Sequence, residues 1–428
     1  MIRKLLAAAL CVAAVSANAE RVRVVVAIDE PRFSIATTAE RRDGVIRSLH
    51  DAAAVETWGE DGRVFAAEID SSQLEALRAD YRVRAITADD GGRGALMQSI
   101  AIVGADRVHE LGYDGSGVTV AVIDTGIDTA NLDFEGRIVE QRCWCDNLDG
   151  TGCCPNGATY QAGPGAAQDD HGHGTHVAGI LAGGGASAPK GVAPRAKIVA
   201  IKVMDAENRF RSFTQIYHAL EWIAKSRPDV KVINMSLGSH SIFSNNACEA
   251  SAVALGMKEL IANLRARGVL ITASSGNEGS ITGATFPACM TDVLGVGATY
   301  DSTDPASRPC VTQFALADQV TCFTNSGDAI DIVAPGADIV ASRRGGGWVM
   351  YIGTSMAAPH VAGALALMQQ VSDGIPSADT LEQILKQSGR LAVDPRDWRF
   401  YPRLDVAAAV EMTPRTVPPA RRRAVGRR

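Results

Sequence analysis

The clearest fold signal in the chain is the stretch "VTVAVID" at residues 118–124. It is almost continuously apolar and rich in β-branched residues, as expected of a strand that lies in a parallel sheet and is buried on both faces. Later stretches have the same character, namely "KIVAIKVM" (197–204), "VKVINMSL" (230–237), "GVLITAS" (268–274) and "DVLGVGA" (292–298). The sequence therefore predicts a mainly parallel central sheet.

Helical segments alternate with these strands. Residues 214–226 and 247–268 place apolar side chains at helical spacing, and Gly268 stands where a helix C-terminal cap belongs. A strand, a helix and a second strand in succession imply a right-handed crossover. We therefore expect a layered α/β domain.

A small separate unit is predicted in front of this domain. Its strand candidates are "RVRVVVAI" (21–28), "RVFAAEI" (63–69) and "YRVRAIT" (81–87). The segment at 71–80 has helical spacing, and Ser72 followed by Glu75 predicts a capping box. The run "DDGGRG" at 89–94 is then expected to form a flexible, exposed joint of the kind that proteases cut.

The two ends of the chain have other roles. Residues 1–19 place Arg3 and Lys4 before a short apolar run that ends in "ANA", which predicts a secretory signal peptide removed after Ala19. The mature protein is therefore expected outside the cell or in a periplasm. Residues 413–428 are rich in arginine and proline and predict a disordered basic tail rather than an interaction arm.

The composition excludes several kinds of partner. Hydrophobic residues make up 46% and charged residues 21%, which is ordinary for a globular protein. The formal net charge of -6 offers no broad basic field, so we expect no nucleic acid partner. Beyond the signal peptide no apolar stretch approaches the length of a membrane span, so we expect no membrane partner either.

Eight cysteines remain once Cys11 is removed with the signal peptide. In an exported chain an even number is most simply a set of disulfides, although their pairing does not follow from the sequence. A four-thiolate zinc site in the loop "CWCDNLDGTGCCP" (143–155) is the competing interpretation, which an oxidising compartment disfavours. The cysteines are Cys143, Cys145, Cys153, Cys154, Cys248, Cys289, Cys310 and Cys322.

The stretch "DDHGHGTHVAG" at 169–179 allows two interpretations. His171, His173 and His176 are spaced as zinc ligands can be, whereas a single histidine of the group can instead move protons for a serine. Asp124 ends a predicted strand, and Ser355 opens a predicted helix. The crevice of an open parallel sheet lies beyond the carboxyl ends of its strands, so these side chains can meet there.

The serine interpretation gives a role to more of these residues than the metal interpretation does. A serine hydroxyl becomes a nucleophile when an imidazole accepts its proton, and a carboxylate orients that imidazole. The order aspartate, histidine, serine is one of the known orders for this constellation. The metal interpretation leaves Asp124, Asn277 and Ser355 without roles.

Four motifs resemble the subtilisin family of serine endopeptidases. They are "VIDTGID", "HGTHVAG", "SSGNEG" and "GTSMAAPHVAG", and the resemblance covers roughly residues 97–410. It implies a three-layer subtilisin-like fold with a mainly parallel central sheet, and hydrolysis of peptide bonds. It also implies a triad of Asp124, His173 and Ser355, with the Asn277 side chain as the donor in the oxyanion hole.

The resemblance extends to substrate binding. "NMSLG" resembles the family's substrate-binding strand, which implies that Ser236, Leu237 and Gly238 pair with extended peptide and flank the S1 pocket. Thr285 in "TFPA" would make that pocket shallower than a glycine would. We expect broad cleavage after medium or large apolar residues of protein substrates.

The resemblance also implies a domain plan. Residues 20–96 resemble the family's inhibitory propeptide, which would be cut after Leu96, and residues 97–412 would form the peptidase domain. The propeptide would be an intramolecular inhibitor of a monomer that needs no catalytic cofactor. The same likeness implies a disulfide between Cys248 and Cys289. That pairing would leave Cys310 to pair with Cys322.

The insertion at 143–157 departs from the simplest family pattern. We expect two local disulfides there, in either order, and Asp146, Asn147 and Asp149 could hold a structural calcium ion or simply form turns. Two rival functions remain open. One is a catalytically silent subtilase fold that binds peptides, and the other is a zinc hydrolase that uses the histidine cluster.

Overall fold

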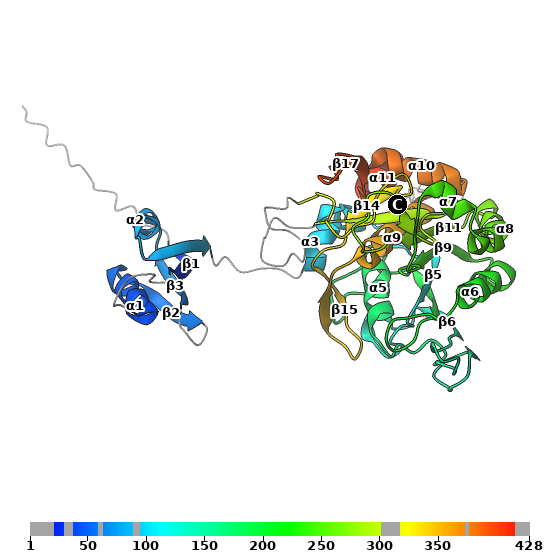
Figure 1. Ribbon diagram of the computed structural model, residues 1–428, viewed down its shortest axis with the longest axis horizontal. Coiled ribbons are helices and arrows are strands. Elements are labelled where there is room, and N and C mark those ends of the chain that lie inside the picture. The colour runs from blue at the N-terminus through cyan, green and yellow to red at the C-terminus, as the bar shows by residue number, and fades with distance from the viewer. Residues whose placement is uncertain are drawn as a thin grey trace, which may run out of the picture. The chain divides into compact units, whose positions relative to one another are not determined.

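The computed structural model describes residues 21–29, 37–58, 63–88, 95–300, 317–372 and 376–415. The chain forms two compact units, residues 1–92 and 93–428 (Figure 1). Several sequence predictions lie outside the described residues. They are the signal peptide at 1–19, the joint at 89–94, Cys310 and most of the tail at 413–428.

The front unit is a four-stranded antiparallel sheet in the order β2-β3-β1-β4. Side chains such as Val26, Phe65 and Val45 form its core. Its elements are β1 (Arg21–Ile28), α1 (Thr38–Ser48), β2 (Ala53–Trp58), β3 (Val64–Asp70), η1 (Ser71–Gln73), α2 (Leu74–Ala79) and β4 (Val83–Ala88).

The capping box predicted at Ser72 and Glu75 is wrong. Ser72 donates its backbone N–H and its hydroxyl to Asp70 Oδ1, at 2.8 Å and 2.6 Å, because Asp70 is the residue that caps the 3-10 turn. A capping box does form at Thr37 and Glu40, at the start of the unpredicted helix α1. That helix escaped prediction because it is mostly polar and buries only Val45.

The large unit is built on a ten-stranded sheet in the order β17-β18-β14-β13-β11-β9-β5-β8-β6-β7. All five predicted strands are present as β5 (Thr119–Asp124), β8 (Lys197–Lys202), β9 (Val230–Met235), β11 (Leu270–Ser274) and β13 (Leu294–Thr299), and they pair in parallel. The others are β6 (Ile138–Trp144), β7 (Tyr160–Ala162), β14 (Ile332–Pro335), β17 (Arg390–Val393) and β18 (Phe400–Arg403). Small two-stranded sheets pair β10 (Ile242–Phe243) with β12 (Ala284–Thr285) and β15 (Ile339–Ser342) with β16 (Trp348–Tyr351).

Helices cover both faces of this sheet, with α5 and α9 on one face and α6 and α8 on the other (Figure 1). Successive side chains of a strand point to opposite faces, so Val120 and Val122 pack in one core and Ala121 and Ile123 in the other. The three-layer α/β prediction is confirmed. The helices are α3 (Ala95–Ile102), α4 (Ala105–Glu110), η2 (Leu132–Phe134), α5 (His173–Ala182), α6 (Phe213–Ser226), α7 (Asn245–Glu249), α8 (Ala252–Ala266), α9 (Thr354–Ser372), α10 (Ala378–Ser388) and α11 (Val406–Met412).

The helix predicted at 247–268 is in fact two helices. Ser251 begins α8, because its hydroxyl accepts the Ala254 N–H at 3.2 Å, and α7 therefore ends before it. The predicted cap is confirmed, since Gly268 follows the helix with a φ of +82°.

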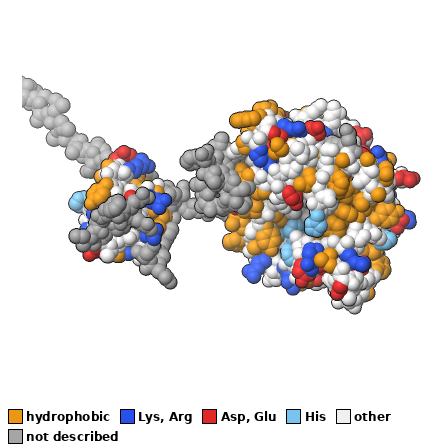
Figure 2. Space-filling model, in the orientation of Figure 1, with side chains coloured by type: hydrophobic (Ala, Val, Ile, Leu, Met, Phe, Trp, Pro, Cys, Tyr) orange, Lys and Arg blue, Asp and Glu red, His pale blue; other side chains and the backbone are white. Residues whose placement is uncertain are grey.

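The surface carries no field of one sign on the face that Figure 2 shows, where acidic and basic side chains are interspersed on the large unit. Within the described ranges, no helix is long and apolar enough to cross a lipid bilayer.

Candidate active site

Three segments bring the predicted catalytic side chains to one edge of the sheet. β5 ends at Asp124, α5 begins at His173, and α9 begins one residue before Ser355. β8 and β9 flank β5 in parallel, so the segments after all three strands emerge at the same edge. This edge is where the crevice of an open α/β sheet forms.

His173 and Asp124 form the best-defined contact at this edge. His173 Nδ1 lies 2.7 Å from Asp124 Oδ1, and the carboxylate is fully buried. Asp124 Oδ1 also accepts the Thr125 N–H at 2.8 Å, which fixes the carboxylate. A donating Nδ1–H leaves Nε2 as the atom that can accept a proton.

Charges around His173 favour its protonated form. Burial of the ring opposes protonation, but the charge and hydrogen bond of Asp124, helped by Asp169, raise the pKa of His173 above the usual 6.5. The ring can therefore become an imidazolium without leaving its partner.

The glycine after His173 is required by close packing. A Cβ at Gly174 would clash with Gly126 O and lie 3.0 Å from Asp124 Oδ1. The first turn of α5 can approach the end of β5 only because this residue has no side chain.

Asp169 joins the loop after Asp124 to the start of α5, a role that the sequence reasoning missed. Its buried carboxylate accepts the Thr125 hydroxyl at 2.9 Å, the Gly172 N–H at 2.9 Å and the Thr175 N–H at 3.0 Å. The acidic pair Asp169 and Asp170 in front of the histidines was the sequence signal from which this role could have been predicted.

Lys202 was missed as well. Its ammonium is fully buried and donates to Asp170 Oδ1 at 2.7 Å, Thr125 O at 3.0 Å and Met204 O at 2.7 Å. A lysine at the end of an otherwise apolar strand was a signal for such a buried, fully bonded cation.

Ser355 is held by a pair of contacts with Ser236. The carbonyl of Ser355 has no helical donor because Pro359, four residues later, lacks an N–H, and the Ser236 hydroxyl donates to that carbonyl at 2.8 Å. The Ser355 hydroxyl donates to Ser236 O at 3.3 Å rather than to His173. Catalytic hydrogen bonds are often loose in ligand-free sites and tighten with substrate.

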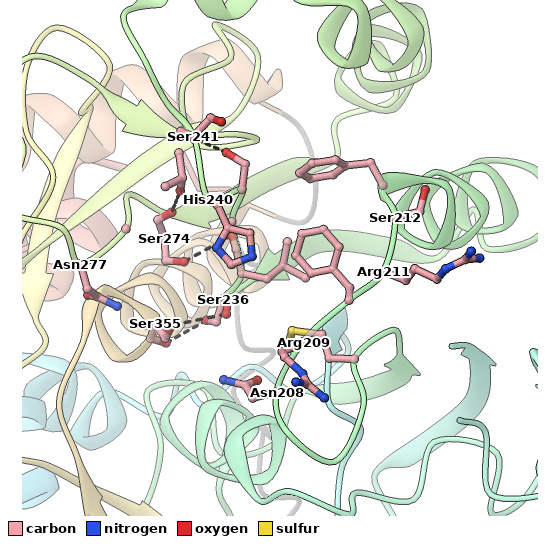
Figure 3. A pocket seen from close by; sticks show the side chains of 18 of the residues that line it. Asn208, Arg209, Arg211, Ser212, Ser236, His240, Ser241, Ser274, Asn277 and Ser355 are labelled. Carbon is pink, nitrogen blue, oxygen red and sulfur yellow. Dashed lines mark hydrogen bonds between the residues drawn. The ribbon is translucent and has the colours of Figure 1, made fainter. Parts of the chain in front are cut away.

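Asn277 is oriented by the start of α9. Its Oδ1 accepts the Thr354 N–H at 2.9 Å and the Thr354 hydroxyl at 3.1 Å, which leaves the amide N–H groups for another acceptor. Asn277 and Ser355 lie beside each other at one end of a cavity (Figure 3). This arrangement can donate to an oxygen that develops negative charge next to Ser355.

The cavity has a volume of about 500 Å³ and runs from Ser355 between the segments 208–213 and 236–241. Ser236, Leu237, Gly238 and Thr285 all line it, as does Glu278. A Cβ at Gly238 would clash with Thr285 Oγ1, so the threonine fills space that a glycine would leave open. The Glu278 carboxylate accepts the Asn325 side-chain N–H at 2.5 Å.

The other two histidines do not converge with His173 on a common point. His171 Nδ1 accepts the His173 N–H at 3.2 Å, while His176 Nε2 lies 3.0 Å from Ile339 O and 3.1 Å from Val349 O. Burial lowers the pKa of His176 to about 3, so that ring is neutral. The metal interpretation of this stretch is wrong.

The cysteines of the insertion form disulfides, Cys143–Cys154 and Cys145–Cys153, which excludes the four-thiolate zinc site. Cys248–Cys289 is also present. Cys310 is outside the described residues, so its pairing with Cys322 stays a prediction.

Two polar side chains of the insertion, those of Asp149 and Asn147, stabilise its own turns. Asp149 Oδ1 accepts the Thr151 N–H and hydroxyl, and the Asn147 side chain donates to Thr151 Oγ1. In the part of the chain that the structure describes, no three histidine, cysteine, aspartate or glutamate side chains are grouped to hold a metal ion. The structure thus lends no support to calcium at Asp146, Asn147 and Asp149.

The chain is similar to known proteins over most of its length. Residues 115–403 match the model of the subtilase family. The chain is 32% identical over 347 residues to an alkaline protease of Alkalihalobacillus alcalophilus, covering 80% of this chain and 76% of that protein. It is 35% identical over 273 residues to subtilisin BL of Lederbergia lenta, covering 63% of this chain and 83% of that protein. The crystal structure of a cold-adapted subtilisin-like serine proteinase matches with a TM-score of 0.52 and 28% identity, covering 68% of this chain and 89% of that one.

Proposed function

The chain belongs to the subtilase family and is a serine endopeptidase, and on that premise we propose that Ser355, His173, Asp124 and Asn277 carry out its catalysis. The observation that carries this proposal is the 2.7 Å contact between His173 Nδ1 and Asp124 Oδ1. Subtilases need no cofactor for catalysis and act on proteins.

In the acylation step, Ser355 Oγ attacks the carbonyl carbon of the scissile peptide bond while His173 Nε2 takes the hydroxyl proton. The carbonyl oxygen becomes an oxyanion, to which the Asn277 side chain and the Ser355 backbone N–H donate. His173 then protonates the leaving amine, and the C–N bond breaks. An acyl-enzyme ester on Ser355 remains.

In the deacylation step, His173 accepts a proton from water, and the resulting hydroxide attacks the ester carbonyl. The same donors hold the second oxyanion. His173 returns the proton to Ser355 Oγ as the ester bond breaks, which restores the enzyme and releases the new carboxyl terminus. Asp124 stabilises the imidazolium in both halves and is not itself protonated.

Substrate would bind as an extended strand beside Ser236, Leu237 and Gly238, with Thr285 limiting the depth of the S1 pocket. We expect broad cleavage after medium or large apolar residues. The close approach of the buried Thr285 side chain to Gly238, which leaves no room for a Cβ there, supports the shallower pocket.

Maturation would follow the domain plan of the sequence. A signal peptide at 1–19 would direct export to the exterior or the periplasm, and the unit at 20–96 would inhibit the enzyme until cleavage after Leu96. The compact α+β fold of the front unit supports a role as an independently folded inhibitor. The enzyme released would be a monomer.

The direct test is hydrolysis of an unfolded protein by the purified enzyme and by three variants, Ser355→Ala, His173→Ala and Asp124→Ala. Each is expected to lower kcat by a factor of about 10⁴ or more, as loss of triad members does in subtilisin. Ser116→Ala, at an exposed serine, is the control and should keep full activity. Activity that survives in Ser355→Ala would contradict the proposal.

A further inference from the structure

A second cavity, the α6 cavity, lies between α6 and the paired strands β6 and β7 at the edge of the large sheet (Figure 1). Its volume of about 330 Å³ is within the range of about 300–1,000 Å³ that small-molecule sites occupy. Among the described residues, it shares no lining side chain with the cavity that contains Ser355. Trp222, which lines it, stands about two and a half turns along α6 from Phe213 of that other cavity. The α6 cavity is therefore separate from the catalytic cleft.

Three aromatic side chains form one wall of the α6 cavity. Trp144 ends β6, and Tyr160, its partner in the antiparallel pairing, begins β7. The ring centroid of Trp144 lies 5.3 Å from that of Tyr160 and 6.0 Å from that of Trp222. Tyr160 is 48% exposed. Contiguous apolar surface of this kind marks a binding site, whereas single scattered apolar side chains do not.

The aromatic wall is fixed in place. Trp144 stands between Cys143 and Cys145, and both of these cysteines form disulfides to the loop that follows. The Arg142 guanidinium lies over the Trp222 ring, 4.7 Å from its centroid. Rings that are held in this way can bind a ligand without first losing conformational freedom.

The charged groups at the α6 cavity balance one another. Glu221 and Lys225 line the cavity from α6, and the Lys225 ammonium donates to the Glu221 carboxylate at 2.8 Å. The Arg142 guanidinium donates to the Glu140 carboxylate at 2.6 Å. Because each cation has an anion beside it, the cavity offers hydrogen-bond donors and acceptors but attracts an ion of neither sign.

The aromatic side chains themselves carry polar groups that a ligand can use. Within the described part of the chain, the indole N–H groups of Trp144 and Trp222 and the hydroxyl of Tyr160 have no protein hydrogen-bond partner. A few polar groups at the rim of an apolar cavity fix the orientation of a bound molecule. The cavity thus suits a ligand that is apolar on one face and polar around its edge.

A carbohydrate has this combination of properties. In a pyranose whose hydroxyls are equatorial, both faces of the ring carry C–H groups, which pack on the electron-rich faces of aromatic rings. The hydroxyls point outward and can pair with the donors and acceptors of the rim. An organic cation fits less well, because the cavity has no net negative charge and Arg142 already lies over Trp222.

We propose that the α6 cavity binds a neutral carbohydrate with equatorial hydroxyls, such as a chain of β-linked glucose or N-acetylglucosamine. A sugar ring packs on the wall of Trp144, Tyr160 and Trp222, and its hydroxyls bond to Glu221 and Lys225. Because the catalytic cleft stays free, the enzyme can cleave proteins while it is attached to a polysaccharide. The binding itself does not depend on the assignment of the triad.

The test is isothermal titration calorimetry of cellohexaose and chitohexaose into the full-length Ser355→Ala protein. At least one of the two sugars should bind, and Tyr160→Ala and Trp222→Ala should each lower its affinity about tenfold or more. Trp398→Ala is the matched control, because Trp398 is 73% exposed and does not line the α6 cavity. Added salt should leave the affinity unchanged, since the ligand is neutral.

Tyr160→Ala is the deciding variant, because Trp222 also packs against the core of the large unit. The urea unfolding transition of Tyr160→Ala should match that of the parent, so a loss of affinity would report on the cavity and not on the fold. If neither sugar bound, or if Tyr160→Ala left the affinity unchanged, the proposal would be overturned. Binding of tetramethylammonium in place of the sugars would overturn it too, since the cavity would then be a site for cations.

Discussion

His173 Nδ1 lies 2.7 Å from Asp124 Oδ1, although the two residues stand at the ends of a helix and a strand that are 49 positions apart in the chain. The contact depends on Gly174, which lets α5 approach β5, and on Asp169, which ties the two loops together. It defines the orientation of the imidazole and leaves Nε2 to exchange a proton with Ser355.

The pH dependence of kcat/KM should report His173. The ring must be neutral to accept a proton, and Asp124 and Asp169 outweigh burial and raise its pKa. Activity on a short peptide should therefore be lost as the pH falls, with a midpoint above 6.5. Asp124→Asn should move the midpoint to lower pH and lower kcat by about 10⁴, as in other serine triads. An unchanged midpoint in this variant would contradict the role given to Asp124.

Removing the oxyanion donor should affect turnover more than binding. Asn277→Ala is expected to lower kcat by about 10² to 10³ with little change in KM, the effect known for the equivalent donor in subtilisin. Asn325→Ala, which loses a buried amide elsewhere beside the cavity, serves as a comparison. If Asn277→Ala raised only KM, the side chain would bind substrate and not the transition state.

Opening the S1 pocket should change which substrates are preferred. Thr285→Gly removes the side chain that packs over Gly238. The ratio of kcat/KM for phenylalanine over alanine before the scissile bond should rise about tenfold, the scale of a hydrophobic pocket contact. Profiling with peptides that differ only at that residue measures the ratio. A ratio that stays constant would show that Thr285 does not set the depth of the pocket.

Two buried histidines should make the fold sensitive to acid. Burial lowers the pKa of His176 to about 3 and that of His360 to about 4. Unfolded chains bind these protons below about pH 6.5, so the free energy of unfolding should fall from there towards pH 4, by on the order of 1–3 kcal/mol per histidine.

This loss of stability at low pH can be measured by urea unfolding at several pH values. The Ser355→Ala background prevents self-cleavage during the measurement. His360→Gln should flatten the pH dependence, even though it lowers stability at neutral pH. The exposed His218→Gln should leave the dependence as it was. If the free energy of unfolding changed with pH equally in all three proteins, the result would contradict the neutral state of His360 in the folded protein.

The strands and the catalytic motifs could be predicted because each carries a local signal. Buried parallel strands such as β5 are continuously apolar, and the motifs around His173 and Ser355 are long. Strand β6 was missed because it lies near the edge of the sheet and mixes polar with apolar side chains. Helix α1 was missed because it buries only Val45, whereas α2 lies within the predicted helical segment 71–80.

The contacts that orient the site could not be predicted, because they join residues far apart in the sequence. The Lys202 ammonium reaches Asp170, and Ser236 satisfies the carbonyl that Pro359 leaves unpaired. The conformation of the insertion at 143–157 depends on how two disulfides pair, and the spacing of the cysteines allowed either order. Only the folded chain distinguishes such alternatives.

The mechanism depends on Ser355 acting as the nucleophile of an assembled triad. Mass spectrometry of the purified enzyme after treatment with a fluorophosphonate tests it most directly, beside the Ser355→Ala variant. A single adduct on Ser355, absent from the variant, is expected. A folded, fully processed protein with no adduct, or with an adduct on another serine, would contradict it.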